Sequence, residues 1–231
     1  MAYTLPDVAW TAVNSEGYPA PVALAADVVV LAVIEGALKV LTVRREDGVR
    51  ALPGGFVDEG ESPEQTARRK LAEKTGLTHL YLEQLALFAE PGRDPRGWIP
   101  SVAYLAPVPS HTSPSDPGAE WTPARGRRRL AFDHRRILRA ALDRLEGKLW
   151  WSNVAVGMLP GAFTMTEARR VYETIAGTTY DPATFARDLK ATGLVEATGK
   201  QRAQGPGRPA ALYRFRAKRL EWGSGRRKRV R

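Results

Sequence analysis

The segment GGFVDEGESPEQTARRKLAEKTGL, residues 54–77, constrains the fold most, because it marks both ends of one helix. Ser62 is a good N-cap, Pro63 suits the first helical position, and Gln65 completes a capping box. Gly76 is a typical stop signal. These local patterns predict a helix between Ser62 and Gly76.

The same segment resembles the Nudix box, G-x5-E-x7-R-E-U-x-E-E-x-G-U, in which U is a bulky apolar residue. The matching residues are Gly55, Glu61, Arg69, Leu71, Glu73, Gly76 and Leu77. Two positions depart from the box, because Lys70 and Lys74 stand where it has glutamate. The resemblance implies that those glutamates would hold the Mg²⁺ that bridges the diphosphate of a substrate.

The two lysines reverse the charge at the expected metal site. Magnesium prefers hard, anionic oxygen ligands, and two ammonium groups would repel it. Lys70 and Lys74 are four residues apart and share one helix face, while Arg69 and Glu73 pair one step round. A merely solvated helix face is the alternative interpretation. We expect a Nudix domain without catalysis, bound metal or cofactor.

The net charge of +10 is unevenly distributed along the 231 residues. Residues 1–115 contain 10 Lys and Arg against 14 Asp and Glu, a balance of −4. Residues 116–231 contain 25 against 11, a balance of +14. The second part has the charge expected for a polyanion partner. Basic segments also occur in proteins that bind no nucleic acid, so charge alone leaves this open.

Composition excludes several classes of protein. There is no cysteine, so disulfides, cysteine-based zinc sites and thiol chemistry are ruled out, and the three histidines are scattered. No apolar run approaches the roughly 20 residues that span a bilayer. The N-terminus MAYTLPDVAW lacks the pattern of a secretory signal. We expect a cytoplasmic protein without a membrane partner.

The first part of the chain reads as strands around the capped helix. A hairpin is predicted from residues 24–34 and 38–43, and further strands from 80–89 and 99–106. Residues 107–118 are rich in Pro and Ser and indicate a loop. The apolar positions of 130–149 recur at three and four residues and predict a long helix.

Residues 151–216 follow a different pattern. Helices are predicted over 164–175 and 181–192, joined by the short turn AGTTY. Two strands, 194–200 and 211–215, then flank the basic loop QRAQGPGRP. Helix, short turn, helix and basic hairpin is the order of a winged helix-turn-helix. The alternative is a small α+β lobe without a nucleic-acid partner.

Such a domain would place its second helix in the major groove and its wing along the backbone or minor groove. We expect Arg187 to read a base, unless it forms an ion pair with Asp188 instead. The basic tail GSGRRKRVR could contact phosphates or only solubilise the chain. The candidate DNA contacts are Thr164, Thr184, Arg187, Lys190, Lys200, Arg202 and Arg208.

Several strings resemble one family over about residues 20–216. VRRED, PGRDPRGWIPSVAYLA and the box resemble ADP-ribose pyrophosphatases. LAFDHRRIL, LPGAFTMTEARRVYETI, DPATFARDLKATGLVE and GRPAALYRF resemble the Nudix-related transcriptional regulators of NAD metabolism. The resemblance implies a Nudix domain that senses ADP-ribose or a related NAD metabolite. It also implies a homodimeric repressor of NAD biosynthesis or salvage genes on double-stranded, palindromic operators.

A diphosphate held without metal needs fixed positive donors, and arginine supplies a bidentate fork. For Arg93 and Arg96 an internal ion-pair clasp with Asp94 is the alternative to ligand contact. Phe56 fits either the core or a pocket wall. The candidate ligand-binding residues are Arg44, Arg45, Gly54, Gly55, Phe56, Lys70, Lys74, Arg93 and Arg96.

We therefore predict an α+β protein of two domains. Residues 1–149 would form a ligand-sensing Nudix fold, a mixed sheet between helices, with helix 130–149 as connector. Residues 150–231 would form the winged helix-turn-helix domain and its basic tail. The main alternative is an active Nudix hydrolase of ADP-ribose-like diphosphates with a basic accessory domain. A third alternative is an RNA-binding adaptor, but the aromatic stacking platform expected of single-strand binders is not evident in this sequence.

Overall fold

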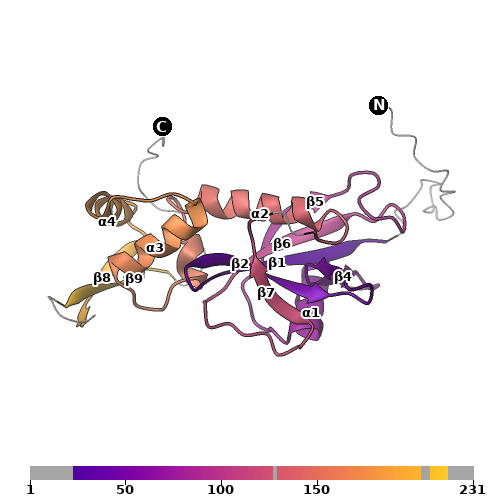
Figure 1. Ribbon diagram of the computed structural model, residues 1–231, viewed down its shortest axis with the longest axis horizontal. Coiled ribbons are helices and arrows are strands. Elements are labelled where there is room, and N and C mark those ends of the chain that lie inside the picture. Colours follow the sequence, from indigo (N-terminus) through magenta and orange to yellow (C-terminus); the bar gives the residue numbers. More distant parts are fainter. Residues whose placement is uncertain (1–22, 127–128, 204–208, 218–231) are drawn as a thin grey trace. The chain divides into compact units, whose positions relative to one another are not determined.

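The computed structural model describes residues 23–126, 129–203 and 209–217 (Figure 1). These residues form two compact units. One comprises residues up to 31, 40–106 and 113–141, and the other residues 32–39, 107–112 and 142 onward. In the residues described, no helix is long and apolar enough to cross a membrane.

A sheet of seven strands, counted over the described residues, organises the first part of the chain. Its order is β3-β2-β1-β6-β5, with β4 paired to β1 and β7 paired to β2. The strands are β1 (Ala25–Ile34), β2 (Ala37–Arg44), β3 (Arg50–Ala51), β4 (Gly54–Phe56), β5 (Glu83–Phe88), β6 (Ser101–Pro107) and β7 (Ala119–Pro123). The predicted hairpin and both later strands are confirmed, whereas β3, β4 and β7 were not predicted.

The register of β4 on β1 explains why residue 54 is a glycine. Gly54 pairs with Asp27, and a Cβ on Gly54 would lie 2.1 Å from Oδ1 of Asp27. A side chain there would force the strands apart, so only glycine permits this approach. The pairing holds β4 directly beside Asp27, the one polar residue of the otherwise apolar strand β1.

The helix α1 (Pro63–Thr75) confirms the capping prediction at both ends. The Ser62 hydroxyl accepts a hydrogen bond from the Gln65 backbone N–H, and the Gln65 side chain accepts one from the Ser62 N–H. Gly76 ends the helix with φ of +72°. Ala67 and Leu71 are buried, so the apolar box residue Leu71 anchors the helix in the core.

The helix α2 (His134–Lys148) begins four residues later than predicted. The delay has a backbone cause, because Phe132 adopts φ of +52°, which no right-handed helix contains. The predicted apolar face is confirmed, with Ile137, Leu138 and Leu145 buried. Contacts divide α2 between the two units after residue 141, and the predicted domain boundary at 149 stays a prediction.

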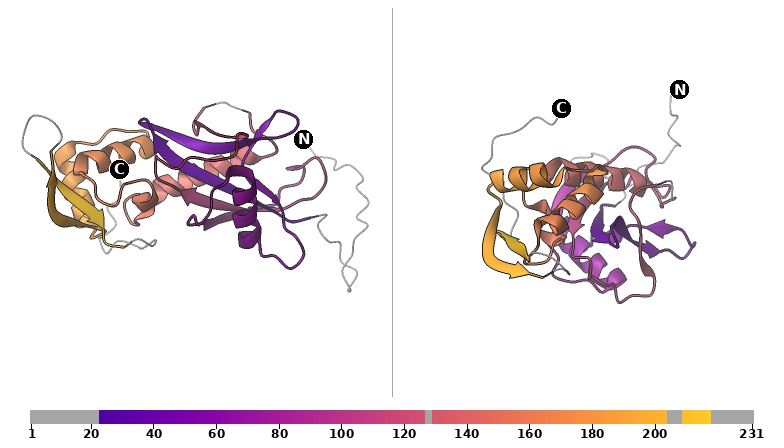
Figure 2. Two further views of the ribbon diagram at one scale, coloured as in Figure 1. Left: turned by 90° about the horizontal axis from the view of Figure 1, so that it is seen from below. Right: turned by 60° about the vertical axis from the view of Figure 1, so that its left-hand side comes forward.

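The remaining elements form a winged helix unit (Figure 2). They are the short 3-10 helix η1 (Val154–Gly157), the helices α3 (Met165–Ala176) and α4 (Pro182–Ala191), and the hairpin β8 (Val195–Arg202) with β9 (Ala210–Phe215). Asp181 caps α4 by accepting from the Thr184 N–H. Both predicted helices and the two-stranded wing are confirmed, each within about two residues at its ends.

An aromatic cluster holds α3 against α4. The rings of Tyr172 and Phe185 meet edge to face with centroids 5.2 Å apart. Trp150 contacts both rings and also Tyr180 in the turn between the helices. Because edge-to-face pairs restrict ring orientation as well as burying area, this cluster fixes the angle between the two helices.

Candidate functional site

One cavity of about 640 Å³ lies in the Nudix part of the chain, within the roughly 300–1,000 Å³ usual for ligand sites. It is bordered by β1, the end of β2, β4, α1, the RDPRG loop and the start of α2. The structure brings eight predicted ligand-binding residues to this cavity, and Lys70 is the one that does not line it. The eight are Arg44, Arg45, Gly54, Gly55, Phe56, Lys74, Arg93 and Arg96.

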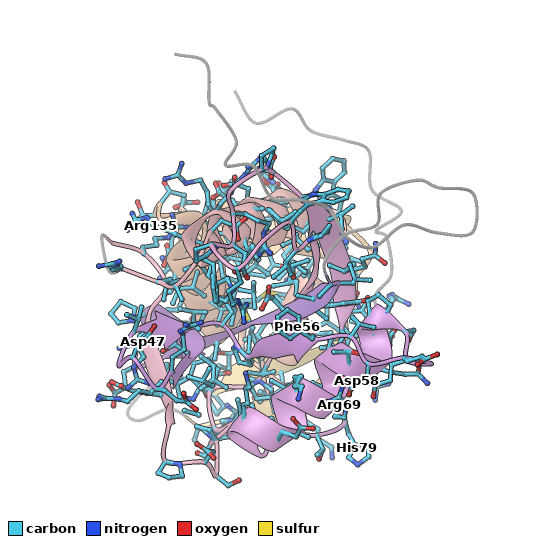
Figure 3. The ribbon with its side chains drawn as sticks, turned by 90° about the vertical axis from the view of Figure 1, so that its right-hand side faces the viewer. Asp47, Phe56, Asp58, Arg69, His79 and Arg135 are labelled. Carbon is cyan, nitrogen blue, oxygen red and sulfur yellow. The ribbon has the colours of Figure 1, made fainter. Side chains whose placement is uncertain are left out.

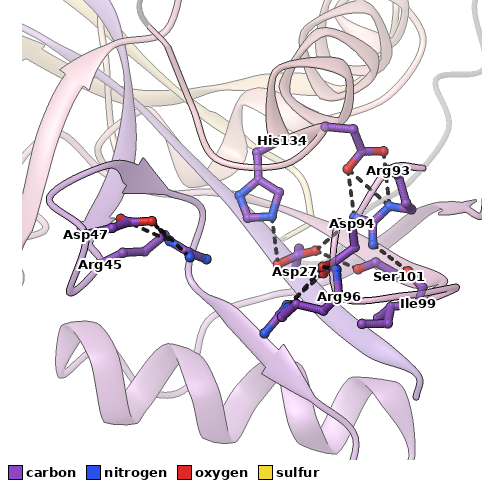
Figure 4. A network of polar contacts seen from close by, with 10 residues as sticks. Asp27, Arg45, Asp47, Arg93, Asp94, Arg96, Ile99, Ser101 and His134 are labelled. Atoms are coloured by element: carbon purple, nitrogen blue, oxygen red, sulfur yellow. Dashed lines mark hydrogen bonds and ion pairs between the residues drawn. The ribbon is translucent and has the colours of Figure 1, made fainter. Parts of the chain in front are cut away.

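A buried polar network forms the floor of the cavity (Figure 4). Asp27 is 5% exposed and accepts a 2.6 Å hydrogen bond from the Ser101 hydroxyl. His134 Nε2 lies 3.5 Å from Asp27 Oδ1, while Nδ1 accepts from the Leu52 N–H. Burial alone would raise the pKa of Asp27, but His134, Ser101 and the Arg93 guanidinium together hold that pKa below its usual value. Asp27 is therefore a fixed negative charge.

The two arginines of the RDPRG loop have different partners. Arg93 is buried, donates to the Asp133 carboxylate at 2.7 Å and to the Ile99 carbonyl, and so forms an internal clasp. Arg96 donates through Nε and Nη2 to Asp94 yet keeps about half of its side chain exposed. The expected pair with Asp94 is therefore found for Arg96, whose half-exposed side chain can still contact a ligand, whereas Arg93 pairs with Asp133 instead.

Two aromatic rings and two guanidinium groups meet at the cavity wall. The Arg96 guanidinium carbon lies 4.8 Å from the Phe56 ring centroid and 4.9 Å from that of Phe132. The Arg45 guanidinium carbon lies 4.6 Å from the Phe132 ring centroid. Arg45 also pairs with Asp47 at 3.1 Å. Phe56 is thus part of the cavity wall and not of the core.

The acidic residues of the box form ion pairs with cationic side chains of α1. Arg69 donates two hydrogen bonds, of 2.7 and 2.6 Å, to the Glu61 carboxylate, and Thr66 donates a third. These bonds hold the pKa of Glu61 at about 2. Arg69 also contacts Asp58 at 2.6 Å, beside which it lies in Figure 3. Glu73 accepts from Lys70 at 2.8 Å, so the Lys70 ammonium group is paired with a carboxylate of the same helix.

Lys74 occupies the position where a Nudix box has its last glutamate. Its Nζ donates to the Gly54 carbonyl at 2.6 Å, so the ammonium group sits at the cavity although much of the side chain is exposed. Partial burial lowers the pKa of Lys74, and the nearby Lys70 charge lowers it further. No group of three or more His, Cys, Asp or Glu among the described residues could hold a metal ion. The residues present do not fit magnesium.

The predicted groove-reading face of α4 is exposed. Thr184, Arg187 and Lys190 all lie on the surface, while Phe185 and Leu189 are buried. Arg187 Nε donates to Asp188 at 3.0 Å, which is the alternative partner expected for it. About two thirds of the Arg187 side chain nevertheless remains exposed. The Lys190 ammonium lies 5.1 Å from the Tyr213 ring centroid.

The other four candidate DNA contacts differ in their surroundings. Lys200 is exposed at the end of the wing. Arg202 donates to Glu167 and to the Ala162 carbonyl, so it also braces the wing against α3. Thr164 is only 2% exposed and serves as the N-cap of α3, which leaves it no surface for DNA, and we leave it out of the interface. Arg208 lies outside the described residues.

The cavity contains functional-site residues that were not among those predicted. Asp27, Phe132 and His134 line it, and Asp133 holds Arg93 beneath it. The string LAFDH contains three of these four residues, so the pattern that supports the family resemblance also marked the cavity. Asp27 had no such signal, because a single acid inside an apolar strand resembles any isolated polar residue.

Two family descriptions match successive parts of the chain. The description "NUDIX domain" matches residues 23–141, and "NrtR DNA-binding winged helix domain" matches residues 155–215. Fold and matches together define a protein in which a Nudix domain precedes a winged helix domain. The predicted α+β class with these two folds is confirmed.

Relatives cover most of the chain. It is 36% identical over 214 residues to the "ADPR responsive transcriptional repressor NtrR" of Acinetobacter baylyi, spanning 86% of this chain and 83% of that protein. Shewanella oneidensis NrtR complexed with a 27mer DNA matches with a TM-score of 0.71 and 35% identity, covering 83% of this chain and 93% of that one. The NUDIX domain of the same Shewanella protein complexed with ADP ribose matches with a TM-score of 0.52 and 36% identity, over 58% and 94%. The chain belongs to the NrtR family of Nudix-related transcriptional regulators.

Proposed function

We propose that this protein is a transcriptional repressor that binds operator DNA through its winged helix domain and responds to ADP-ribose or a related NAD metabolite. Its targets would be genes of NAD biosynthesis or salvage. The proposal rests on family membership and on a cavity of ligand size that combines arginine and lysine donors with aromatic rings.

The proposed ligand would be held by hydrogen-bond donors and not by excess charge. The cavity lining contains five Lys and Arg against six Asp and Glu, so its formal charges nearly cancel. Most of those carboxylates are already bonded to protein groups, as in the pairs Arg45–Asp47 and Arg96–Asp94. Arginine has five N–H donors and lysine three, so these cations keep donors for a diphosphate. We assign the diphosphate to Arg45, Lys74 and Arg96.

We further propose that the Nudix domain does not hydrolyse its ligand. Arg69 and Lys70 engage Glu61 and Glu73, and Lys74 puts an ammonium group at a metal-ligand position. An active hydrolase would need Mg²⁺ to displace these cations from their carboxylates. The support is thus the ion pairing of the box itself. Clear, chelator-sensitive turnover of ADP-ribose would instead favour the hydrolase alternative.

For DNA we propose that α4 enters the major groove and the β8–β9 wing lies on the backbone. Arg187 would contact a base edge, with Thr184 and Lys190 beside it. Lys200, Arg202 and Arg208 would contact phosphates. A homodimer would then prefer a palindrome whose half-sites are spaced by about one helical turn of DNA or a multiple.

The deciding experiment is a fluorescence-anisotropy titration of the full-length protein with DNA from its own upstream region, with and without ADP-ribose. We expect specific binding at near-physiological salt and a change of affinity on adding ADP-ribose. No preference for this DNA over a scrambled duplex would refute the repressor assignment. Unchanged affinity in saturating ADP-ribose would refute the response.

A further inference from the structure

The β8–β9 hairpin, which forms the wing, lies beside α3 (Figure 1). At its inner end Val195 pairs with Phe215, both side chains are buried, and the Phe215 ring lies 5.3 Å from that of Phe163. The backbones of Phe163 and Tyr213 also exchange two hydrogen bonds of 2.8 Å. The inner end of the wing is therefore fixed by the core of the winged helix unit.

The pairing of the two wing strands is interrupted between the ends of the hairpin. The register shifts between Ala197 and Gln201, and Gly199 within this stretch has a φ of +75°. Such an irregularity bends a strand and breaks its ladder of hydrogen bonds. The outer end of the wing, where Arg202 pairs with Ala210, is thus not held rigidly by the inner end and needs an anchor of its own.

The Arg202 side chain supplies this anchor. Its Nη1 donates to Glu167 Oε1 at 2.7 Å, and its Nη2 donates to the Ala162 carbonyl at 2.9 Å. Because β9 lies between β8 and the Phe163 backbone, the Arg202 side chain has to span β9 to reach these acceptors. Two acceptors fix a planar guanidinium group in orientation as well as in position.

The two carboxylate oxygens of Glu167 have different partners. Oε1 accepts from Arg202, whereas Oε2 accepts from the Thr164 backbone N–H at 2.7 Å and from the Thr164 hydroxyl at 3.2 Å. The bonds with Thr164 belong to the capping box that begins α3. One carboxylate thus joins the first turn of α3 to the outer end of the wing.

The helix α3 is also the support of α4, because the rings of Tyr172 and Phe185 pack edge to face between the two helices. It is therefore a common frame for α4 and for the wing. We propose that Glu167 is a positioning residue for operator recognition, which holds the wing through Arg202 at the angle to α4 that lets both contact one DNA duplex. The inference rests on the proposed function, since it concerns how the proposed DNA contacts are arranged.

The sign of the effect on DNA binding separates positioning from electrostatics. A carboxylate near DNA repels phosphates, so loss of its charge alone should tighten binding to every duplex. Glu167→Gln keeps the capping box, for which glutamine is suitable, but weakens the bond with Arg202. We expect this variant to bind the operator about three- to tenfold more weakly than the wild type, because the wing must then be ordered during binding.

Fluorescence anisotropy of full-length variants with DNA from the protein's own upstream region measures this loss. Glu196→Gln is the matched control, because Glu196 pairs with Arg214 inside the hairpin, and it should bind as tightly as the wild type or more tightly. Arg202→Lys keeps the charge for a phosphate but lacks the planar fork. It should lose about as much affinity as Glu167→Gln, and the double variant should lose no more than either.

Hydrogen exchange of the free protein tests the anchor without DNA. Backbone amides of the outer end, residues 200–202 and 210–211, should exchange faster in Glu167→Gln, while those of the inner end keep wild-type rates. The melting temperature should change little, because 31% of the Glu167 side chain and 40% of the Arg202 side chain are exposed, and such ion pairs add little stability.

The outcomes separate the anchor from the function on which it rests. Equal or tighter operator binding by Glu167→Gln, or unchanged exchange at the outer end of the wing, would overturn the positioning role alone. Additive losses in the double variant would show that Arg202 and Glu167 act separately and would also overturn it. A wild-type protein without preference for its upstream DNA over a scrambled duplex would overturn the proposed function, and with it the role of Glu167 on DNA.

Discussion

His134 Nε2 lies 3.5 Å from Asp27 Oδ1, and this contact joins the first turn of α2 to the strand under the cavity. The other ring nitrogen, Nδ1, accepts from the Leu52 backbone N–H at 2.9 Å and can therefore carry no proton. The proton then resides on Nε2, facing Asp27. One imidazole thus bonds a buried backbone donor and a buried carboxylate at once.

His134→Ala should lower the free energy of unfolding by about 1–3 kcal/mol, because the Leu52 N–H loses its acceptor in a buried place. Thermal melting of the full chain measures the loss, and the Nudix transition should shift. The exposed His111→Ala is the matched control and should change little. Equal melting of wild type and His134→Ala would show that the hydrogen bond is not stabilising.

Reversing the two box lysines should create affinity for divalent ions. In Lys70→Glu with Lys74→Glu, carboxylates replace ammonium groups beside Glu73, and magnesium prefers such oxygen ligands. Titration with Mg²⁺ or Mn²⁺, followed by calorimetry, should show binding that the wild type lacks. Arg68→Glu makes a charge reversal on the same helix outside the cavity lining and should not bind the metal. Equal metal binding by the two variants would contradict a specific role for these positions.

Arg45→Ala should reduce the rise in melting temperature that ADP-ribose produces. A ligand that binds only the native state stabilises it by mass action, so a tenfold weaker ligand gives about 1.4 kcal/mol less stabilisation at saturation. Differential scanning fluorimetry at several ligand concentrations measures this. Arg136→Ala removes an arginine that pairs with Glu90 away from the cavity lining, and its ligand shift should match the wild type. A full shift in Arg45→Ala would remove Arg45 from the site.

Arg187→Ala should weaken operator binding by about 1–3 kcal/mol and relax preference at one base pair. Arg187→Lys keeps the charge but loses the bidentate fork, so it should lose discrimination and retain most nonspecific affinity. Lys200→Ala should instead reduce the salt dependence of DNA binding, and by the same amount for every DNA sequence. Anisotropy titrations over a range of salt concentrations separate the two effects. If Arg187→Ala binds operator like the wild type, its pair with Asp188 is the whole of its role.

Acid should destabilise the protein partly through Glu61. Its pKa in the folded state is about 2, against an ordinary 4.5, because Arg69 donates two hydrogen bonds to the carboxylate. A lowered pKa stabilises the fold above about pH 4.5, and that contribution disappears as the pH falls toward 2. Melting temperatures between pH 7 and pH 2.5 should show a component that Glu61→Gln lacks. Glu64→Gln, on the same helix, is the control and should keep it.

Local features could be predicted because their causes are local. The ends of α1 follow from Ser62, Gln65 and Gly76, whose cap interactions span only three or four residues. The order of the helices and the wing could likewise be predicted from caps, turns and the alternation of apolar and polar residues. The altered box could be recognised because one helix sets the spacing of its residues.

The tertiary structure decided what each side chain contacts. No sequence pattern shows that Arg93 would clasp Asp133, forty residues away, or that Asp27 would meet His134 across the sheet. The two lysines at equivalent box positions also diverge, since Lys70 turns to Glu73 and Lys74 reaches the Gly54 carbonyl. Caps and turns are set by neighbours along the chain, whereas a cavity is made by segments that only the pairing of strands brings together. That is why the chain's own sequence determined its class and its altered box, and the folded structure alone brought Phe56 and Phe132 to one cavity.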